Sequence, residues 1–330
     1  MTDETPTTWP VKIRDMHTHQ LKSTRWDDFK FRDDDIIIAT YAKSGTTWTQ
    51  QIVAQLLFNG AEEINTSRMS PWVEHRILPE EVIAALEQQI HRRFMKTHLP
   101  VDALVFSPKA KYIHVGRDGR DAAWSFHNHQ FNAKDELFIR INAGMPEGTR
   151  PWERGSADPL DFYRLWLAEN GYPLWPFWDH VRSWWSIRDL PNVLQIHFNH
   201  LKSDTETSIR KIADFLAIEI DEANWSRIVE HCSFDWMKKN ASSIAPFGGM
   251  MWQGGGQTFI NKGTNGRWRD ALSPGEVAAY EARALAELGP ECARWLATGE
   301  KLSDCLRKRE LIETCSMADG GANKAAFKRR

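Results

Sequence analysis

Three short apolar runs, rich in β-branched residues, stand out along the chain at residues 35–42, 110–117 and 192–198. Each run is bounded by polar residues and is too short for a helix, which is typical of strands buried on both faces of a parallel sheet. The pattern of apolar positions therefore predicts three buried strands.

A stretch with helical periodicity follows each predicted strand. These stretches cover residues 46–60, 119–131 and 203–218, and Ser203 or Asp204 is placed to cap the third helix. The repeated order of strand, loop and helix predicts an α/β fold, a central parallel sheet flanked by helices on both faces. Ligands of such sheets bind beyond the carboxyl ends of the strands, so we expect a site in these loops.

Tryptophan is abundant, with 16 residues in the chain. Four of them crowd into one short stretch: Trp175, Trp178, Trp184 and Trp185. Their spacing suits one face of a helix, which favours packing on the sheet over a direct role in binding a ligand.

The chain has 330 residues, of which 42% are hydrophobic and 26% charged, as expected for a globular protein with a packed core. Neither an internal repeat nor a linker rich in Pro or Ser divides it, so we expect one domain over residues 1–330. The glycine-rich stretch at residues 248–256 is expected to be mobile without a partner, and residues 318–330 are expected to form a disordered tail.

The net charge and the length of the apolar runs limit the partners that the chain is expected to bind. The formal net charge is −2, so no global field attracts nucleic acid or an anionic membrane. No apolar run approaches the ~20 residues that span a bilayer, and the N-terminus lacks the apolar core of a signal peptide. We therefore expect no membrane insertion, a cytoplasmic location and no partner protein.

Cysteine spacing bears on metal binding. The chain has four cysteines, none in a C-x-x-C pair and none beside a histidine cluster with zinc spacing. The pattern predicts unpaired thiols and no metal site. The cysteines are Cys232, Cys292, Cys305 and Cys315.

The sequence YAKSGTTW, residues 41–48, joins the first predicted strand to the first predicted helix. It lacks the Walker A order G-x-x-x-x-G-K-[ST], but Gly45 permits close backbone approach and Lys43 adds a positive charge at a helix N-terminus. Hydroxyl donors come from Ser44, Thr46 and Thr47. The stretch favours an anion site over an ordinary strand–helix turn, which stays open.

Two further loops have anion-binding character. In the first, Arg117 ends the second predicted strand and Ser125 lies on the helix that follows. In the second, residues 258–270 include Lys262 and Gly263. Arginine suits phosphate because its planar guanidinium donates two parallel hydrogen bonds. Taken alone, Arg117 or Arg120 favours a surface salt bridge, and residues 258–270 favour a solvated loop.

In this order, the three loops resemble motifs of the cytosolic sulfotransferases, which use 3′-phosphoadenosine 5′-phosphosulfate (PAPS). Residues 41–48 resemble the family's 5′-phosphosulfate loop, residues 116–125 its 3′-phosphate motif, and residues 260–268 its R-K-G-x-x-G-x-W motif. MKTHLP at residues 95–100 and CSFDWMKKN at residues 232–240 are similar to the family's K-T-H and T-S-F-x-x-M-K-x-N segments.

The resemblance covers about residues 33–270, is closest in style to bacterial members, and implies a P-loop-like nucleotide-binding architecture. It implies transfer of a sulfuryl group by in-line displacement, with His98 as the general base, Lys43 at the leaving phosphate and Lys96 near the sulfuryl group. No metal is implied, because lysines and backbone N–H groups replace the Mg²⁺ of kinases.

The resemblance also implies the residues that hold PAPS and its product, 3′,5′-adenosine diphosphate (PAP). Trp48 and Phe234 match the rings on the two faces of the adenine. Four residues match the 3′-phosphate ligands: Arg117, Ser125, Lys262 and Gly263. The full implied set is Lys43, Ser44, Gly45, Thr46, Thr47, Trp48, Arg117, Ser125, Phe198, Ser233, Phe234, Asn261, Lys262 and Gly263.

Some positions depart from the family pattern. Asn261 stands where the last motif begins with arginine, so one charge contact to the 3′-phosphate is missing unless Arg267 or Arg269 supplies it. Phe198 replaces a tyrosine, and Cys232 replaces a threonine that contacts the adenine. The family's dimer motif, K-x-x-x-T-V-x-x-x-E, is not matched by RDALSPGEVA, so that dimer is not expected.

The acceptor is expected to bind among apolar side chains between the motifs. The candidates are Trp72, Phe126, Phe131, Phe247 and Met250. Such a lining suits a small lipophilic alcohol or phenol, although each side chain could equally belong to the core. Residues 248–256 are a candidate lid over both ligands.

Alternative functions stay open from the sequence alone. One is a nucleotide-dependent, kinase-like phosphotransferase, and another is a non-catalytic nucleotide-binding protein. A third possibility is net dehydration, since a sulfated allylic alcohol can eliminate its sulfate.

Overall fold

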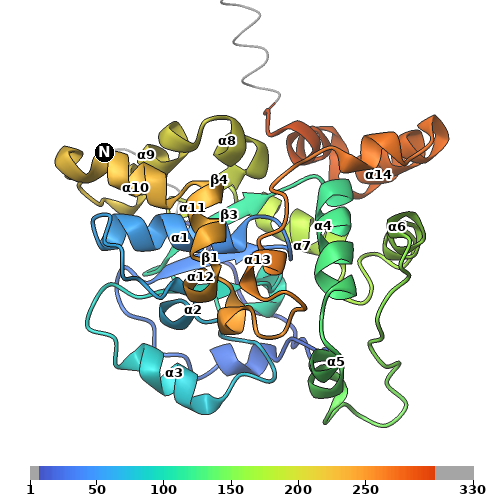
Figure 1. Ribbon diagram of the computed structural model, residues 1–330, viewed down its shortest axis with the longest axis horizontal. Coiled ribbons are helices and arrows are strands. Elements are labelled where there is room, and N and C mark those ends of the chain that lie inside the picture. Colours follow the sequence, from blue (N-terminus) through green and yellow to red (C-terminus); the bar gives the residue numbers. More distant parts are fainter. Residues whose placement is uncertain (1–6, 302–330) are drawn as a thin grey trace, which may run out of the picture.

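The centre of the molecule is a four-stranded parallel sheet in the order β2-β1-β3-β4 (Figure 1). The structure is a computed structural model and describes residues 7–301. The strands are β1 (Ile36–Thr40), β2 (Phe94–Thr97), β3 (Lys111–Gly116) and β4 (Val193–His197). The predicted α/β fold is confirmed, and the three predicted strands are β1, β3 and β4.

Strand β2 was missed by the analysis of the sequence. It is only four residues long and contains Lys96 and Thr97, so its apolar signal is too short and too polar to stand out. In the sheet, Lys96 pairs with Ile38 of β1. The strand forms because β1, already buried, offers it a hydrogen-bonding edge.

Helices surround the sheet. Those of the first half of the chain are α1 (Thr46–Leu57), α2 (Thr66–Met69), α3 (Glu80–Glu87), α4 (Gly119–Phe131), α5 (Asp135–Asn142) and α6 (Pro159–Ala168). Those of the second half are α7 (Phe177–Ser186), α8 (Phe198–Ser203), α9 (Thr205–Leu216), α10 (Trp225–His231), α11 (Phe234–Lys239), α12 (Ala241–Ile244), α13 (Gly256–Phe259) and α14 (Pro274–Thr298). The three predicted helices are α1, α4 and α9, and Asp204 caps α9 by accepting a hydrogen bond from the Thr207 N–H.

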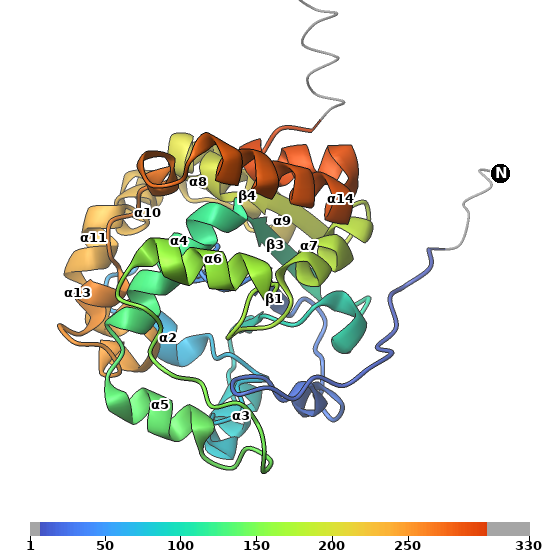
Figure 2. The ribbon, with the colours of Figure 1, turned by 90° about the vertical axis from the view of Figure 1, so that its right-hand side faces the viewer.

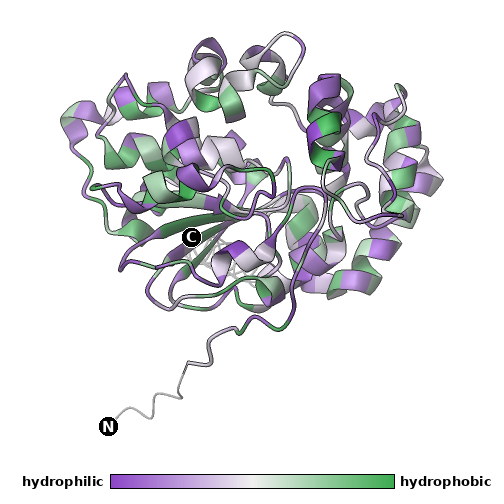
Figure 3. Cartoon of the chain, turned by 90° about the horizontal axis from the view of Figure 1, so that it is seen from below, coloured by the Kyte–Doolittle hydropathy of each residue, from purple (hydrophilic) through white to green (hydrophobic). Residues whose placement is uncertain are grey.

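Both faces of the sheet are covered, because successive residues of β1 point in opposite directions. Ile36 and Ile38 pack in one hydrophobic cluster with residues of α1, α9 and α10. Ile37 and Ala39 pack in the other with residues of α4, α6, α7 and α14, the helices that Figure 2 views from outside. In Figure 3 the central strands are coloured as hydrophobic and the helices carry both colours, consistent with one buried side each.

The tryptophan-rich stretch forms α7 and the turn before it. Trp178 and Trp184 are fully buried against the sheet, as the spacing predicts. Trp175 precedes the helix and reaches a cavity instead, where its ring lies 5.4 Å from the ring of His98.

Several predictions concern parts of the chain at or beyond the described residues. The predicted tail at 318–330, Cys305 and Cys315 lie outside them. Cys232 and Cys292 are free and buried. Among residues 7–301, no helix is long and apolar enough to cross a membrane, and no group of three or more His, Cys, Asp or Glu side chains is placed to hold a metal ion.

Candidate active site

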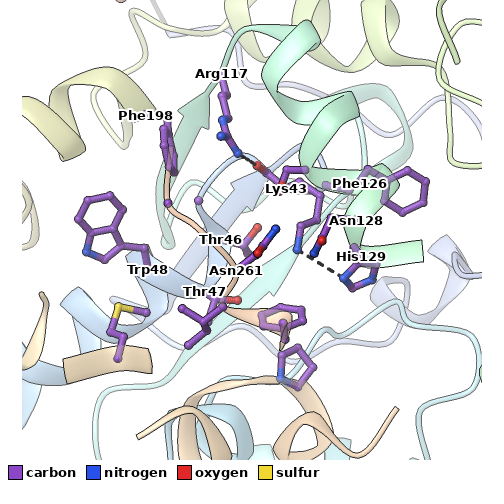
Figure 4. A pocket seen from close by; sticks show the side chains of 18 of the residues that line it. Lys43, Thr46, Thr47, Trp48, Arg117, Phe126, Asn128, His129, Phe198 and Asn261 are labelled. Atoms are coloured by element: carbon purple, nitrogen blue, oxygen red, sulfur yellow. Dashed lines mark hydrogen bonds between the residues drawn. The ribbon is translucent and has the colours of Figure 1, made fainter. Parts of the chain in front are cut away.

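A cavity of about 460 Å³ opens at the carboxyl edge of the sheet (Figure 4). Because all four strands run in parallel, their carboxyl ends meet at this edge. Each end delivers at least one cavity residue, among them Lys43 after β1, His98 after β2, Arg117 after β3 and Phe198 after β4. Residues that are widely separated in the chain are thereby brought together.

The loop from β1 to α1 is shaped for close contact with an anion. Gly45 has φ of +105°, and a Cβ there would lie 3.0 Å from the Phe198 ring, so only glycine fits without strain. Gly45 is also the N-cap of α1 and no side chain caps it, which leaves the first N–H groups of the helix for a ligand. Thr46 and Thr47 line the cavity, whereas Ser44 is buried and does not.

Two lysines, Lys43 and Lys96, line the cavity and form no ion pair with a carboxylate within the described residues. Lys43 Nζ lies 3.4 Å from His129 Nδ1 and 4.4 Å from the centre of the Phe259 ring. Burial, together with the charges of Arg117 and Lys96, lowers the Lys43 pKa to about 7. Burial lowers the Lys96 pKa to about 8 despite the opposing attraction of Glu74. An anion bound between the two lysines would stabilise their charged forms.

His98 presents one ring nitrogen to the cavity. Its Nδ1 lies 2.6 Å from the carbonyl oxygen of Thr40, and a carbonyl only accepts, so Nδ1 carries the proton. Nε2 is therefore the nitrogen with a free lone pair. Burial and the charge of Lys96 lower the His98 pKa to about 3, which keeps the ring neutral.

The Glu74 carboxylate holds His98 and its neighbours in place through hydrogen bonds. Its carboxylate is fully buried and accepts hydrogen bonds from the His98 N–H at 2.7 Å and from Trp72 Nε1 at 2.5 Å. Two further donors are Thr97 Oγ1 at 3.0 Å and Trp26 Nε1 at 2.9 Å. One carboxylate thus positions both His98 and the Trp72 ring, whose centre lies 4.6 Å from that of His98.

A second group of cations lies at the far side of the β1–α1 loop. Arg117 donates to the Lys43 carbonyl at 2.6 Å and to Asn265 Oδ1 at 2.7 Å, and it lies 4.1 Å from the centre of the Phe198 ring. Ser125 of α4 lines the same region, with Lys262 from the C-terminal loop. Arg120, the other arginine of this motif, instead forms a buried ion pair with Asp118.

Aromatic side chains between these groups form a slot. Trp48 and Phe198 are in edge contact at 5.8 Å, and Trp48 Nε1 donates to the Cys232 carbonyl at 2.8 Å. Phe234 lines the cavity from α11 and lies so near Gly263 that a Cβ there would be 2.8 Å from its ring. The Cys232 side chain is buried and does not line the cavity.

We call the part of the cavity around Lys43, Arg117 and Trp48 the donor end. Every residue that the resemblance assigns to donor binding lines the cavity except Ser44. Lys96 and His98 line it as well. The structure thus brings together segments near residues 43, 117, 198, 233 and 262.

We call the part around Trp72, Phe126 and Phe247 the acceptor end, and all three side chains line the cavity. The structure does not bring Phe131 and Met250 to it, since they are 40% and 66% exposed and outside the lining. Their apolar character could not show which way they point. The stretch at 248–256 is joined to the α4–α5 turn through a bridge of Ala133 with Trp252.

Other acceptor-end residues escaped the analysis of the sequence. They are Gln20, His75, Asn128, His129, Leu137, Leu174, Trp175, Pro246 and Trp252. The helical spacing from Ser125 to Asn128 and His129 was a usable signal, since residues three and four apart share one face of a helix. His75 is neutral, because burial and the charge of Lys96 lower its pKa to about 3.

Known proteins resemble this chain in sequence. The family model described as the sulfotransferase domain matches residues 33–288. A glycolipid sulfotransferase of Mycobacterium bovis is 33% identical over 325 residues, 91% of this chain and 98% of that protein. Mouse sulfotransferase 1B1 is 31% identical over 279 residues, 81% of this chain and 87% of that protein.

Solved structures share the fold. The crystal structure of mouse sulfotransferase SULT7A1 complexed with PAP aligns with a TM-score of 0.65 at 24% identity, over 83% of this chain and 92% of that chain. Retinol dehydratase, solved with androsterone and PAP, aligns with a TM-score of 0.58 over 80% of this chain and 83% of that chain. Because the family model spans most of the chain and a relative above 30% identity covers nearly all of it, the protein belongs to the sulfotransferase family and is a sulfotransferase enzyme.

Proposed function

We propose that the enzyme transfers the sulfuryl group of PAPS to a hydroxyl group, with His98 as the general base. The observation that carries the proposal is the position of Nε2, which faces a cavity with two unpaired lysines while Nδ1 is fixed on the Thr40 carbonyl. A neutral base beside cations suits a reaction in which a hydroxyl loses a proton and an anion leaves.

The donor end fits a nucleotide that carries two anionic groups. The N-terminus of α1 and Lys43 form one anion site, and Arg117, Ser125 and Lys262 form another. The cavity is also lined by the rings of Trp48 and Phe234, and aromatic rings suit a purine. PAPS has this distribution of charge and ring, and the SULT7A1 structure, of the same fold, holds PAP.

The proposed step forms a bond between the acceptor oxygen and sulfur while the bond from sulfur to the phosphate oxygen breaks. The acceptor proton passes to Nε2 of His98, and the electron pair of the broken bond leaves on PAP. Lys43 and Lys96 stabilise the negative charge that grows on the leaving oxygen. The donor's charge also opposes the effect of Lys96 on His98, which raises the pKa of the base towards its usual range.

The acceptor is proposed to be a small alcohol or phenol with an apolar body, since Trp72, Phe126 and Phe247 form the walls. A glycolipid is the second candidate, since the Mycobacterium bovis relative carries that name. A specific observation favours it: Gln20 and the neutral ring of His75 also line this end and could bond the neighbouring hydroxyls of a sugar.

The test is calorimetric binding of PAP, ATP and adenosine 5′-phosphosulfate in the presence of a metal chelator, followed by transfer from labelled PAPS. We expect PAP to bind at least 100-fold more tightly than ATP, and label to appear on a hydroxyl acceptor. Steroids, simple phenols and glycolipids serve as the acceptor panel. Equal binding of ATP, or a need for Mg²⁺, would instead support the kinase-like alternative.

A further inference from the structure

We propose that Arg267 holds the 3′-phosphate of the donor and supplies the charge that Asn261 lacks. This inference rests on the proposed use of PAPS. Arg267 belongs to the same C-terminal loop as Asn261 and lies six residues further along the chain. In effect, the arginine of this phosphate site has moved along its loop.

The backbone places Arg267 at the right part of the cavity. The residue begins the 3₁₀-helix Arg267–Asp270, directly after Gly266, which has a left-handed φ of +79°. The Gly266 N–H donates to Asp121 Oδ1 of α4 at 2.7 Å, which fastens this turn beside the helix that carries Ser125. The Arg267 side chain lines the cavity together with Arg117 and Lys262.

The guanidinium of Arg267 makes no hydrogen bond and no ion pair with the described residues. Its Nε is shielded from solvent but donates no hydrogen bond, and none of the ion pairs within residues 7–301 includes it. Arg117 Nε is in the same condition. Buried N–H donors nearly always find an acceptor in folded proteins, so two such donors at one end of a cavity point to an absent anion.

Of the other arginines nearby, one forms an ion pair and the other lies outside the cavity lining. Arg120 is held by Asp118 at 2.7 Å, and its guanidinium lies 3.8 Å from the centre of the Trp268 ring. Arg269 is exposed and does not line the cavity. Of the two arginines that could replace the missing one, the structure therefore favours Arg267.

The local charge also favours a doubly negative ligand. Arg117, Arg267, Lys202 and Lys262 all line the cavity. Asp121 is the carboxylate that attracts both Arg117 and Arg267, and it already accepts from Gly266. Asn261 offers no charge, and its carbonyl is bonded by Lys238 at 3.1 Å. A phosphate dianion would neutralise the excess positive charge and accept hydrogen bonds from both guanidinium groups.

The experiment compares two ligands that differ by the 3′-phosphate. PAP carries it and adenosine 5′-phosphosulfate does not. Arg267→Ala should weaken PAP binding by about 10- to 100-fold, as expected for lost hydrogen bonds to a charged group, and change adenosine 5′-phosphosulfate binding by less than about twofold. Arg269→Ala, a matched arginine outside the cavity, should leave both affinities within about twofold.

A charge-relocation variant provides the decisive control. Asn261→Arg in the Arg267→Ala background restores the arginine of the family motif and should recover at least about tenfold of the lost PAP affinity. Binding of adenosine 5′-phosphosulfate reports in every variant that the site is folded. An Arg267→Ala enzyme that retains wild-type PAP affinity would overturn the inference, as would equal losses for both ligands.

The outcomes separate this inference from the function on which it rests. If the wild-type enzyme does not prefer PAP over adenosine 5′-phosphosulfate, the proposed donor is wrong. If the wild type prefers PAP and the Arg267→Ala variant keeps that preference, only the role of Arg267 is wrong. In steady state, the inference requires a higher KM for PAPS with little change in kcat.

Discussion

At the donor end of the cavity, charged side chains and free N–H groups project from loops, and Lys43, Arg117 and Arg267 form no ion pair within residues 7–301. At the acceptor end, aromatic rings and neutral imidazoles project from helices and from the segment before β2. The donor end is thus prepared for one fixed pattern of charge, whereas the acceptor end offers a shape with scattered hydrogen-bonding groups. This difference between the two ends of the cavity best suits one common donor and variable acceptors.

His98 stands between the two ends, and its removal should have the largest effect. We expect His98→Ala to lower kcat by about 10²- to 10⁴-fold, the usual contribution of a general base, with the affinity for PAP nearly unchanged. His17→Ala, an exposed histidine outside the cavity, is the control. Turnover that survives in His98→Ala would exclude the proposed mechanism.

Lys43 tests the electrostatics of the donor end. Lys43→Met should lower kcat by about 10²- to 10³-fold, comparable to the loss of one oxyanion donor in other enzymes. The replacement keeps a similar length and removes only the charge. Lys109→Met, which changes an exposed lysine far from the cavity, should have no effect on kcat.

The lowered pKa values predict that the affinity for PAP depends on pH. Free Lys43 and Lys96 have pKa values of about 7 and 8, and a bound anion raises both. Binding should therefore take up protons at pH 8, and the affinity should fall as the pH rises above 7. Calorimetry in buffers of different ionisation enthalpy measures the uptake, and Lys43→Met should reduce it. A pH-independent affinity between pH 7 and 9 would contradict the assignment.

Glu74 joins the two ends through His98 and Trp72. Glu74→Gln keeps one oxygen for these donors but directs an amide N–H₂ at Trp26, which should lower the free energy of unfolding by about 1–3 kcal/mol. We expect kcat to fall by roughly tenfold because the base is less well held. Adding Trp26→Phe removes the opposed N–H and should restore part of the stability in urea titrations. Unaltered stability in Glu74→Gln would mean that the buried carboxylate is already protonated.

The smallest effect should come from the acceptor walls. Trp72→Phe removes part of the ring against His98 and should raise the KM of the acceptor by a few fold, with the affinity for PAP unchanged. Phe131→Leu, an exposed position outside the lining, is the control. If both variants alter the acceptor KM equally, the boundary drawn here for the acceptor end is wrong.

The same contrast explains what the sequence could predict. Residues 43–48 are contiguous because one strand–loop–helix unit forms most of an anion site, so the motif is visible in the chain. Strands β1, β3 and β4 were visible because burial on both faces makes them uniformly apolar. Strand β2 was not visible, since pairing with β1, and not its own composition, holds it in place.

The acceptor end was less predictable for a physical reason. His75 and Gln20 belong to it only because distant segments fold against β2, and Glu74 acquires its role from Trp26, which is 48 residues away in sequence. Phe131 shows the converse, since an aromatic residue beside a motif still points away from the cavity. The direction in which a side chain points is set by tertiary packing, and the local sequence pattern does not reveal that packing.

The end of α14 has a consequence for how the protein is made. The Trp295 ring covers Gly116 at the end of β3, where a Cβ would lie 2.3 Å from it, and His197 Nε2 at the end of β4 is 2.9 Å from the Leu296 carbonyl. The strand ends that deliver Arg117 and Phe198 are thus supported by a helix that follows both strands in the chain. During synthesis, the ends of β3 and β4 gain this support only after α14 has been translated.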